Sequence, residues 1–304
     1  MIVTIANPIY DAIFKYLMED QRIAKTVLSA LLKKEVVKVE IRPLEYANST
    51  KDRISMFRLD FAVTIRDENG KESAILIELQ KTWVETETLR FRQYLGTYYN
   101  LKDNVREENG QPYALPLVAI YILVHRVGDI NEPILYVSHG TFDYNGNAVS
   151  EGIPNTFVES ITHDSIIVQI PLLNGQNNNR LLKVLSVFDQ SNADKHNTQL
   201  MRFDEDMYKG DVELQYLLQR LERAALDARL RQDMNVEDEY YGELEKRDTQ
   251  LMQREKVIAE QQQRLDQYEA DIVQSIKNLR KLGLDNKTIA ATLNRDISFV
   301  EGID

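Results

Sequence analysis

Near the start of the chain, apolar residues recur at helical spacing. Asn7 is a capping residue type and Pro8 suits the first helical position, so the sequence predicts a helix that opens there. The apolar positions that follow lie mainly three or four residues apart, as on one face of a helix. This stripe consists of Ile9, Ile13, Phe14, Leu17, Ala24, Val27, Leu28 and Leu31.

Strand-like patterns follow this helix. Asp67-Glu68-Asn69-Gly70 predicts a hairpin turn, because Asn and Gly adopt the positive φ angles that such turns need. Residues 115–124 are almost continuously apolar, which is typical of a buried strand. The predicted order is α-β-β-β-α-β, an α/β core on a small mixed sheet. Its expected strands are 36–44, 56–66, 73–80 and 115–124, with a helix at 88–102.

The pattern changes after this core. From about residue 210 the chain is mostly helical, and apolar residues recur every seven positions, as in one seam of a coiled coil. The companion seam includes Asp248, Glu255 and Glu269, so two interpretations stay open: weak pairing with a second copy, or packing on the protein's own core. The seam residues are Leu244, Leu251, Ile258, Leu265, Ile272 and Leu279.

These patterns predict three regions: a core domain at 1–190, a helical and partly coiled-coil extension at 191–274, and a tail at 275–304. Short apolar runs around Gly283 predict two or three small helices in the tail. They fit a miniature helix-turn-helix and equally a helical cap with no nucleic-acid role. Before the extension we expect further strands at 134–137 and 165–171, a helix at 181–188 and a linker at 189–197.

Composition narrows the class of protein. The 304 residues include no cysteine, which excludes disulfides and thiolate metal sites. No stretch approaches the roughly 20 apolar residues that span a bilayer, so we expect a cytoplasmic protein without a membrane partner. The formal net charge of -11 opposes simple nonspecific binding to nucleic acid. Residues 1–125 carry 17 basic and 17 acidic side chains, however, so the acidic excess lies after them.

Two carboxylates stand out in the predicted hairpin. Alternation along a strand places Asp60 on one face with Ala62, and Glu78 on one face with Gln80. A carboxylate in an otherwise apolar strand is costly unless it has a partner. Mg²⁺ is a natural partner, because it favours one or two carboxylates together with water and substrate phosphate. Asp60 and Glu78 are therefore candidate metal ligands.

The order and spacing of these residues resemble the PD-(D/E)XK nuclease superfamily. More specifically, they are similar to its recombination-promoting nuclease and transposase-like branch, and the matching motifs are dense between residues 7 and 124. The segments that carry it are Asp11-Ala12-Ile13-Phe14-Lys15, Leu59-Asp60-Phe61, Ile77-Glu78-Leu79-Gln80, the helix with Arg90, Tyr94 and Tyr98, and Gly110 with Tyr113. The tail from Gly283 to Val300 also resembles the end of many members.

The resemblance implies a restriction-endonuclease-like fold and metal-dependent hydrolysis of DNA. Asp60 and Glu78 would hold Mg²⁺ or Mn²⁺, with Gln80 at the position where the superfamily usually has lysine. Lys81 is next in sequence but faces the other way on an unbroken strand, so Lys15 is the better substitute if its helix packs beside the strands. Asp11, one helical turn earlier, would complete the metal environment.

Each assignment has a purely structural alternative. Gln80 is also consistent with a buried hydrogen bond, and Asp11 with Lys15 is consistent with a simple surface ion pair. Arg90, Tyr94 and Tyr98 form one helical stripe, which fits substrate contact or packing. The sequence thus predicts a metal-dependent DNA endonuclease, involved in recombination, transposition or phage defence. The alternatives are a nuclease-fold protein that binds DNA or a protein without cutting, and an adaptor that works through its long helix.

Overall fold

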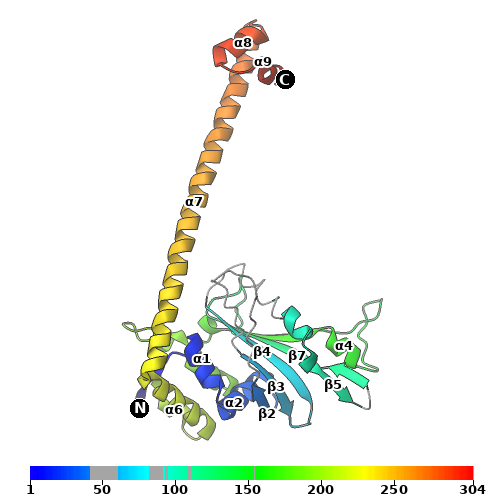
Figure 1. Ribbon diagram of the computed structural model, residues 1–304, viewed down its shortest axis with the longest axis vertical. Helices are drawn as coiled ribbons and strands as arrows, with labels where there is room; N and C mark the ends of the chain where they lie inside the picture. Colours follow the sequence, from blue (N-terminus) through cyan, green and yellow to red (C-terminus); the bar gives the residue numbers. More distant parts are fainter. Residues whose placement is uncertain (42–60, 82–91, 93–94, 109–110, 154, 304) are drawn as a thin grey trace. The chain divides into compact units, whose positions relative to one another are not determined.

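A computed structural model describes residues 1–41, 61–81, 92, 95–108, 111–153 and 155–303. The chain forms two compact units, Met1–Glu237 and Asp238–Asp304. The first is built on a mixed six-stranded sheet, so the predicted α/β class is confirmed (Figure 1). Its strand order is β2-β3-β4-β7-β9-β8, in which β4, β7 and β9 run parallel and the other neighbours antiparallel. The bounds are β2 Val36–Ile41, β3 Phe61–Asp67, β4 Glu72–Gln80, β7 Leu117–Leu123, β8 Ile134–Val137 and β9 His163–Gln169.

The predicted hairpin is present. Strands β3 and β4 pair antiparallel, with Phe61 opposite Ile77 and Thr64 opposite Ala74. Gly70 has a φ of 78°, the left-handed conformation that the turn requires. The buried Asp67 carboxylate closes the turn by accepting hydrogen bonds from the backbone amides of Asn69 and Lys71.

The two faces of the sheet bury different clusters. Helices α1 (Asp11–Met18) and α2 (Gln21–Leu32) pack on the face that carries Ile77 and Leu79. The opposite face carries Leu76 and packs against a segment at 95–99, which is helical and falls within the predicted helix at 88–102. The alternation expected along β4 is therefore confirmed. Its odd-numbered side chains lie on the face covered by α1 and α2, and its even-numbered side chains lie on the opposite face.

The N-terminal region differs from the prediction in two respects. The apolar stripe forms two helices rather than one, because the side chain of Asp20 accepts from the amides of Arg22 and Ile23 and opens a new helix. Asn7 is not the cap of α1, which begins at Asp11. It is fully buried and hydrogen-bonds to Gln190 instead.

The first unit also extends beyond the boundary expected at residue 190. Strand β1 (Ile2–Ala6), which the pattern did not predict, pairs antiparallel with β10 (Leu200–Asp204). Helix α6 (Val212–Leu226) buries Leu214, Leu217 and Leu221 in the same core as α1. Residues up to Glu237 thus belong with the sheet.

The remaining elements of this unit are β5 Val105–Glu108, β6 Gln111–Ala114, α4 Thr156–Ser160, α5 Arg180–Leu185, and the short 3₁₀ helices η1 Lys102–Asn104, η2 Ile170–Leu172, η3 Ser186–Phe188, η4 Gln190–Asn192 and η5 Glu205–Tyr208.

Helix α7 (Ala228–Lys281) begins in the first unit and provides most of the second. After it, Gly283 has a φ of 86° and turns the chain into α8 (Asn286–Leu293) and α9 (Ile297–Glu301). Ile276, Ile289, Ala290 and Val300 form a small core there, which confirms the helical tail. Within the described residues, no helix has the length and hydropathy that a membrane crossing requires.

Candidate functional site

Glu78 is the most deeply buried of the described candidate residues that carry a charge. It lies in β4 and is only 3% exposed. Its neighbours on the same face belong to the cluster of Ala62, Leu76 and Ala119, which is apolar. Removing a carboxylate from water in this way is costly unless cations or hydrogen-bond donors compensate it. The burial of Glu78 therefore fits a metal ligand and fits a structural carboxylate compensated by hydrogen bonds equally well.

The adjacent strand places a tyrosine beside this carboxylate. Strand β7 runs parallel to β4, and Tyr121 lies opposite Glu78 in the register. Burial raises the pKa of the Tyr121 phenol, and the negative charge of Glu78 raises it further. The Tyr121 phenol therefore stays protonated beside Glu78.

Gln80 lies at the end of β4, two positions after Glu78, and is half-buried. Its backbone carbonyl accepts a hydrogen bond of 3.0 Å from the amide of Val124. In the parallel pair Gln80 lies opposite Leu123, so both strands end at the same edge of the sheet. Ligands of α/β proteins commonly bind outside the carboxyl ends of parallel strands.

Three of the predicted site residues lie outside the described part of the chain: Asp60, Arg90 and Tyr94. Tyr98 is described and is only 2% exposed. Its ring belongs to the core cluster with Leu95 and Leu115. This burial favours the packing interpretation of Tyr98 over contact with a substrate.

Asp11 and Lys15 do come together, with 2.7 Å between the Asp11 Oδ2 and Lys15 Nζ atoms. They belong to α1, however, which packs on the face of Ile77 and Leu79. Alternation along β4 directs Glu78 to the other face. The structure therefore does not place Lys15 beside Glu78 as a replacement for the lysine that Gln80 lacks.

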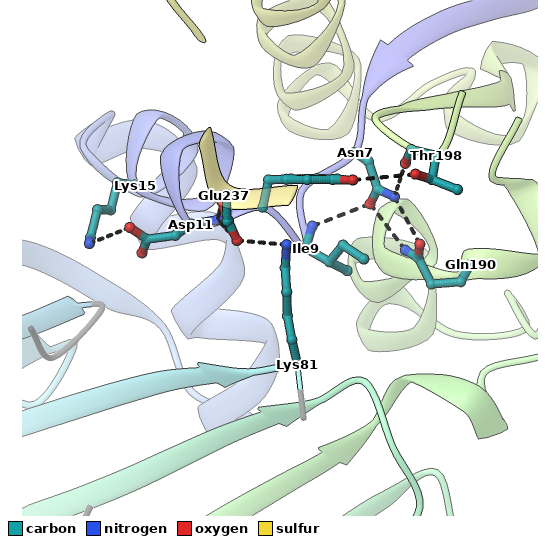
Figure 2. A network of polar contacts seen from close by, with 9 residues as sticks. Asn7, Ile9, Asp11, Lys15, Lys81, Gln190, Thr198 and Glu237 are labelled. Carbon is teal, nitrogen blue, oxygen red and sulfur yellow. Dashed lines mark hydrogen bonds and ion pairs between the residues drawn. The ribbon is translucent and has the colours of Figure 1, made fainter. Parts of the chain in front are cut away.

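Lys81 points to the α1 side, as expected for the position after Gln80, and there it meets a residue that the sequence analysis did not identify. Its Nζ atom lies 2.6 Å from Glu237 Oε1, and the two side chains are 13% and 14% exposed. The same ammonium group lies 3.7 Å from the centre of the Tyr10 ring. Figure 2 shows Lys81 reaching from the strand end to Glu237.

Glu237 also contacts the start of α1. The backbone amide of Asp11 donates to both of its carboxylate oxygens, at 2.9 and 3.2 Å. Burial raises the pKa of Glu237, although the charge of Lys81 and the hydrogen bonds partly offset this. No local sequence signal marks Glu237, because its partners Asp11 and Lys81 are remote in the chain and Glu is common throughout α7.

Within the described ranges, no group of three or more His, Asp or Glu residues is arranged to hold a metal ion. The predicted pair includes Asp60, which those ranges leave out. The chain matches no protein-family model, and comparison with curated proteins and with solved structures gives no match either. The candidate site therefore rests on the residues themselves.

Proposed function

We propose that the chain is a metal-dependent DNA endonuclease of the PD-(D/E)XK type. The observation that carries the proposal is the burial of Glu78 on the apolar face of β4, two residues before the strand ends. Asp60 immediately precedes β3, the antiparallel partner of β4. The resemblance of the surrounding motifs supplies the class of reaction.

In this proposal Asp60 and Glu78 hold Mg²⁺ or Mn²⁺. When bound, such an ion lowers the pKa of a coordinated water and stabilises negative charge on the attacked phosphate. Gln80 accepts a hydrogen bond from the attacking water through its amide oxygen and so orients it. It adds no positive charge, which predicts slower cleavage than lysine at this position would allow. Arg90 and Tyr94 remain proposed contacts to the DNA backbone.

A second candidate function is DNA or protein binding without cleavage. The placement of Lys15 and Lys81, the two possible substitutes for the lysine that Gln80 replaces, favours this second function. Lys15 pairs with Asp11 and Lys81 pairs with Glu237, both on the face away from Glu78. The net charge of -11 also weakens generic attraction to DNA. In this second candidate function the fold is the same, but the protein does not cleave DNA.

Cleavage of supercoiled and linear DNA with Mg²⁺ or Mn²⁺ separates the two. The variants are Asp60→Asn, Glu78→Gln and, as a matched control on the same strand, Glu72→Gln, whose carboxylate pairs with Arg66 and Arg106. We expect cleavage that requires metal, a loss of at least 100-fold in the first two variants, and near wild-type rates in the control. Cleavage that persists in Glu78→Gln would contradict the site. Chelator-resistant DNA binding by an inactive wild type would favour the second candidate.

A further inference from the structure

Helix α1 begins without a side-chain cap of its own. The residue before it is Tyr10, which provides no capping hydrogen bond. The exposed amides at a helix start need acceptors, and the positive end of the helix dipole attracts negative charge. Glu237 supplies both, because its two carboxylate oxygens accept from the amide of Asp11. A residue in the third turn of α7 thus completes the first helix of the fold.

The same carboxylate holds the end of β4. Lys81 directly follows Gln80, and its ammonium group is enclosed between Glu237 and the Tyr10 ring. The pair is largely buried, so water screens it less than a surface ion pair. On the neighbouring strand, the amide of Val124 donates to the carbonyl of Gln80. The last peptide of β4 is therefore held from the side of α1 and from the side of β7.

The contacts of Lys81 also affect the opposite face of β4, which carries Glu78 and Gln80. Successive side chains of a strand point to opposite faces, so Lys81 and Gln80 point in opposite directions. A contact that fixes Lys81 therefore also fixes the backbone from which Gln80 projects. A strand end frays unless such contacts hold it. Catalytic groups also need accurate placement, since a shift of about 1 Å can cost on the order of 100-fold in rate.

We propose that Glu237 is a positioning residue for the candidate nuclease site. By holding Lys81 and the start of α1, it fixes the strand end that carries Gln80 and Glu78. This inference rests on the proposed function for its effect on cleavage, while its structural part concerns β4 alone. Its contacts are the Asp11 amide and the Lys81 ammonium group on the α1 side, so it acts on the site through the backbone of β4.

The test compares Glu237→Ala, Glu237→Gln and Lys81→Met in the full chain. Glutamine keeps an acceptor for the Asp11 amide and for Lys81, so it is the conservative rescue variant. The matched control is Glu213→Ala, which removes another carboxylate that pairs with a remote cation, Arg22, at 2.6 Å. Cleavage kinetics and amide hydrogen exchange of residues 78–81 are measured for each.

We expect kcat to fall at least tenfold in Glu237→Ala and Lys81→Met, with KM for DNA nearly unchanged and partial recovery in Glu237→Gln. Exchange at 78–81 should accelerate at least tenfold in the first two variants and not in Glu213→Ala. A lower melting temperature with unchanged kcat and exchange would overturn the inference and leave Glu237 a purely structural residue.

The two proposals fail in different ways. If the wild type does not cut DNA, the exchange measurement still decides whether Glu237 holds the end of β4: unchanged exchange overturns the inference, and accelerated exchange upholds its structural part. If the wild type cuts and Glu237→Ala cuts equally well, positioning by Glu237 is refuted while the nuclease assignment stands.

Discussion

The Lys81 ammonium nitrogen lies 2.6 Å from a carboxylate oxygen of Glu237, and little of either side chain is exposed. An ion pair in such surroundings is not strongly stabilising in itself, because both charges lose hydration. Removing one partner is a different matter, since the remaining charge stays buried without compensation. The pair therefore makes the first unit sensitive to single substitutions at either residue.

Lys81→Met tests this sensitivity. We expect the free energy of unfolding to fall by about 3 kcal/mol, because Glu237 is left as a buried carboxylate without its cation. The pKa of Glu237, already raised by burial, should rise further. Urea unfolding measures the loss. Lys38→Met is the control, since the pair of Lys38 with Glu40 is exposed and its removal should leave the midpoint nearly unchanged. Equal losses in both variants would contradict the argument.

Asn7→Ala should also destabilise the first unit. The Asn7 amide nitrogen donates to Gln190 and to the carbonyl of Thr198, both at 2.8 Å, and the residue is fully buried. Alanine leaves these partners unsatisfied, which predicts a loss of about 2–3 kcal/mol in thermal or urea unfolding. Asn155→Ala, which removes the exposed cap of α4, should cost about 1 kcal/mol or less. A smaller effect at Asn7 than at Asn155 would refute the buried network.

Acid should weaken the hairpin through Asp67. Burial alone would raise the pKa of this carboxyl, but hydrogen bonds from the Lys71 amide and from Lys34 outweigh burial and lower it. A lowered folded-state pKa means that this stabilisation is present above about pH 4 and is lost as the pH falls through the folded-state value. The stability difference between wild type and Asp67→Asn should therefore shrink below pH 4 in melting curves. A difference that is constant with pH would count against this role for the Asp67 charge.

One of the two interpretations of the α7 seam, pairing with a second copy, predicts self-association. Among its described side chains, Ile258 and Leu265 are 63% and 56% exposed, and both would be buried in a coiled coil. Leu265→Glu should lower the average mass in light scattering at micromolar concentration. Gln263→Glu adds the same charge on the opposite side of the helix and should have no effect. A wild type that stays monomeric at all concentrations would exclude the dimer.

Much of the candidate strand pair followed from local pattern. The spacing of apolar residues in β3 and β4 and the Asn69-Gly70 turn are short-range features, so the hairpin and its faces were predictable. The same alternation indicated that Lys81 faces away from Glu78. The roles of Asp60 and Glu78 in metal binding stay predictions, because they depend on a motif resemblance and on Asp60, which lies outside the described residues.

The sequence by itself determined the elements whose signals are local: an apolar helical stripe, alternating strands, a turn with the required glycine, and a heptad seam. Only the tertiary structure decided which remote residues meet. It turned Asn7 from a helix cap into part of a buried network with Gln190, paired β1 with β10, and brought Glu237 to both Asp11 and Lys81. The physical reason is that the burial and pairing of polar groups depend on the whole packed core. The residues next to Glu237 in the sequence do not indicate which remote residue it pairs with.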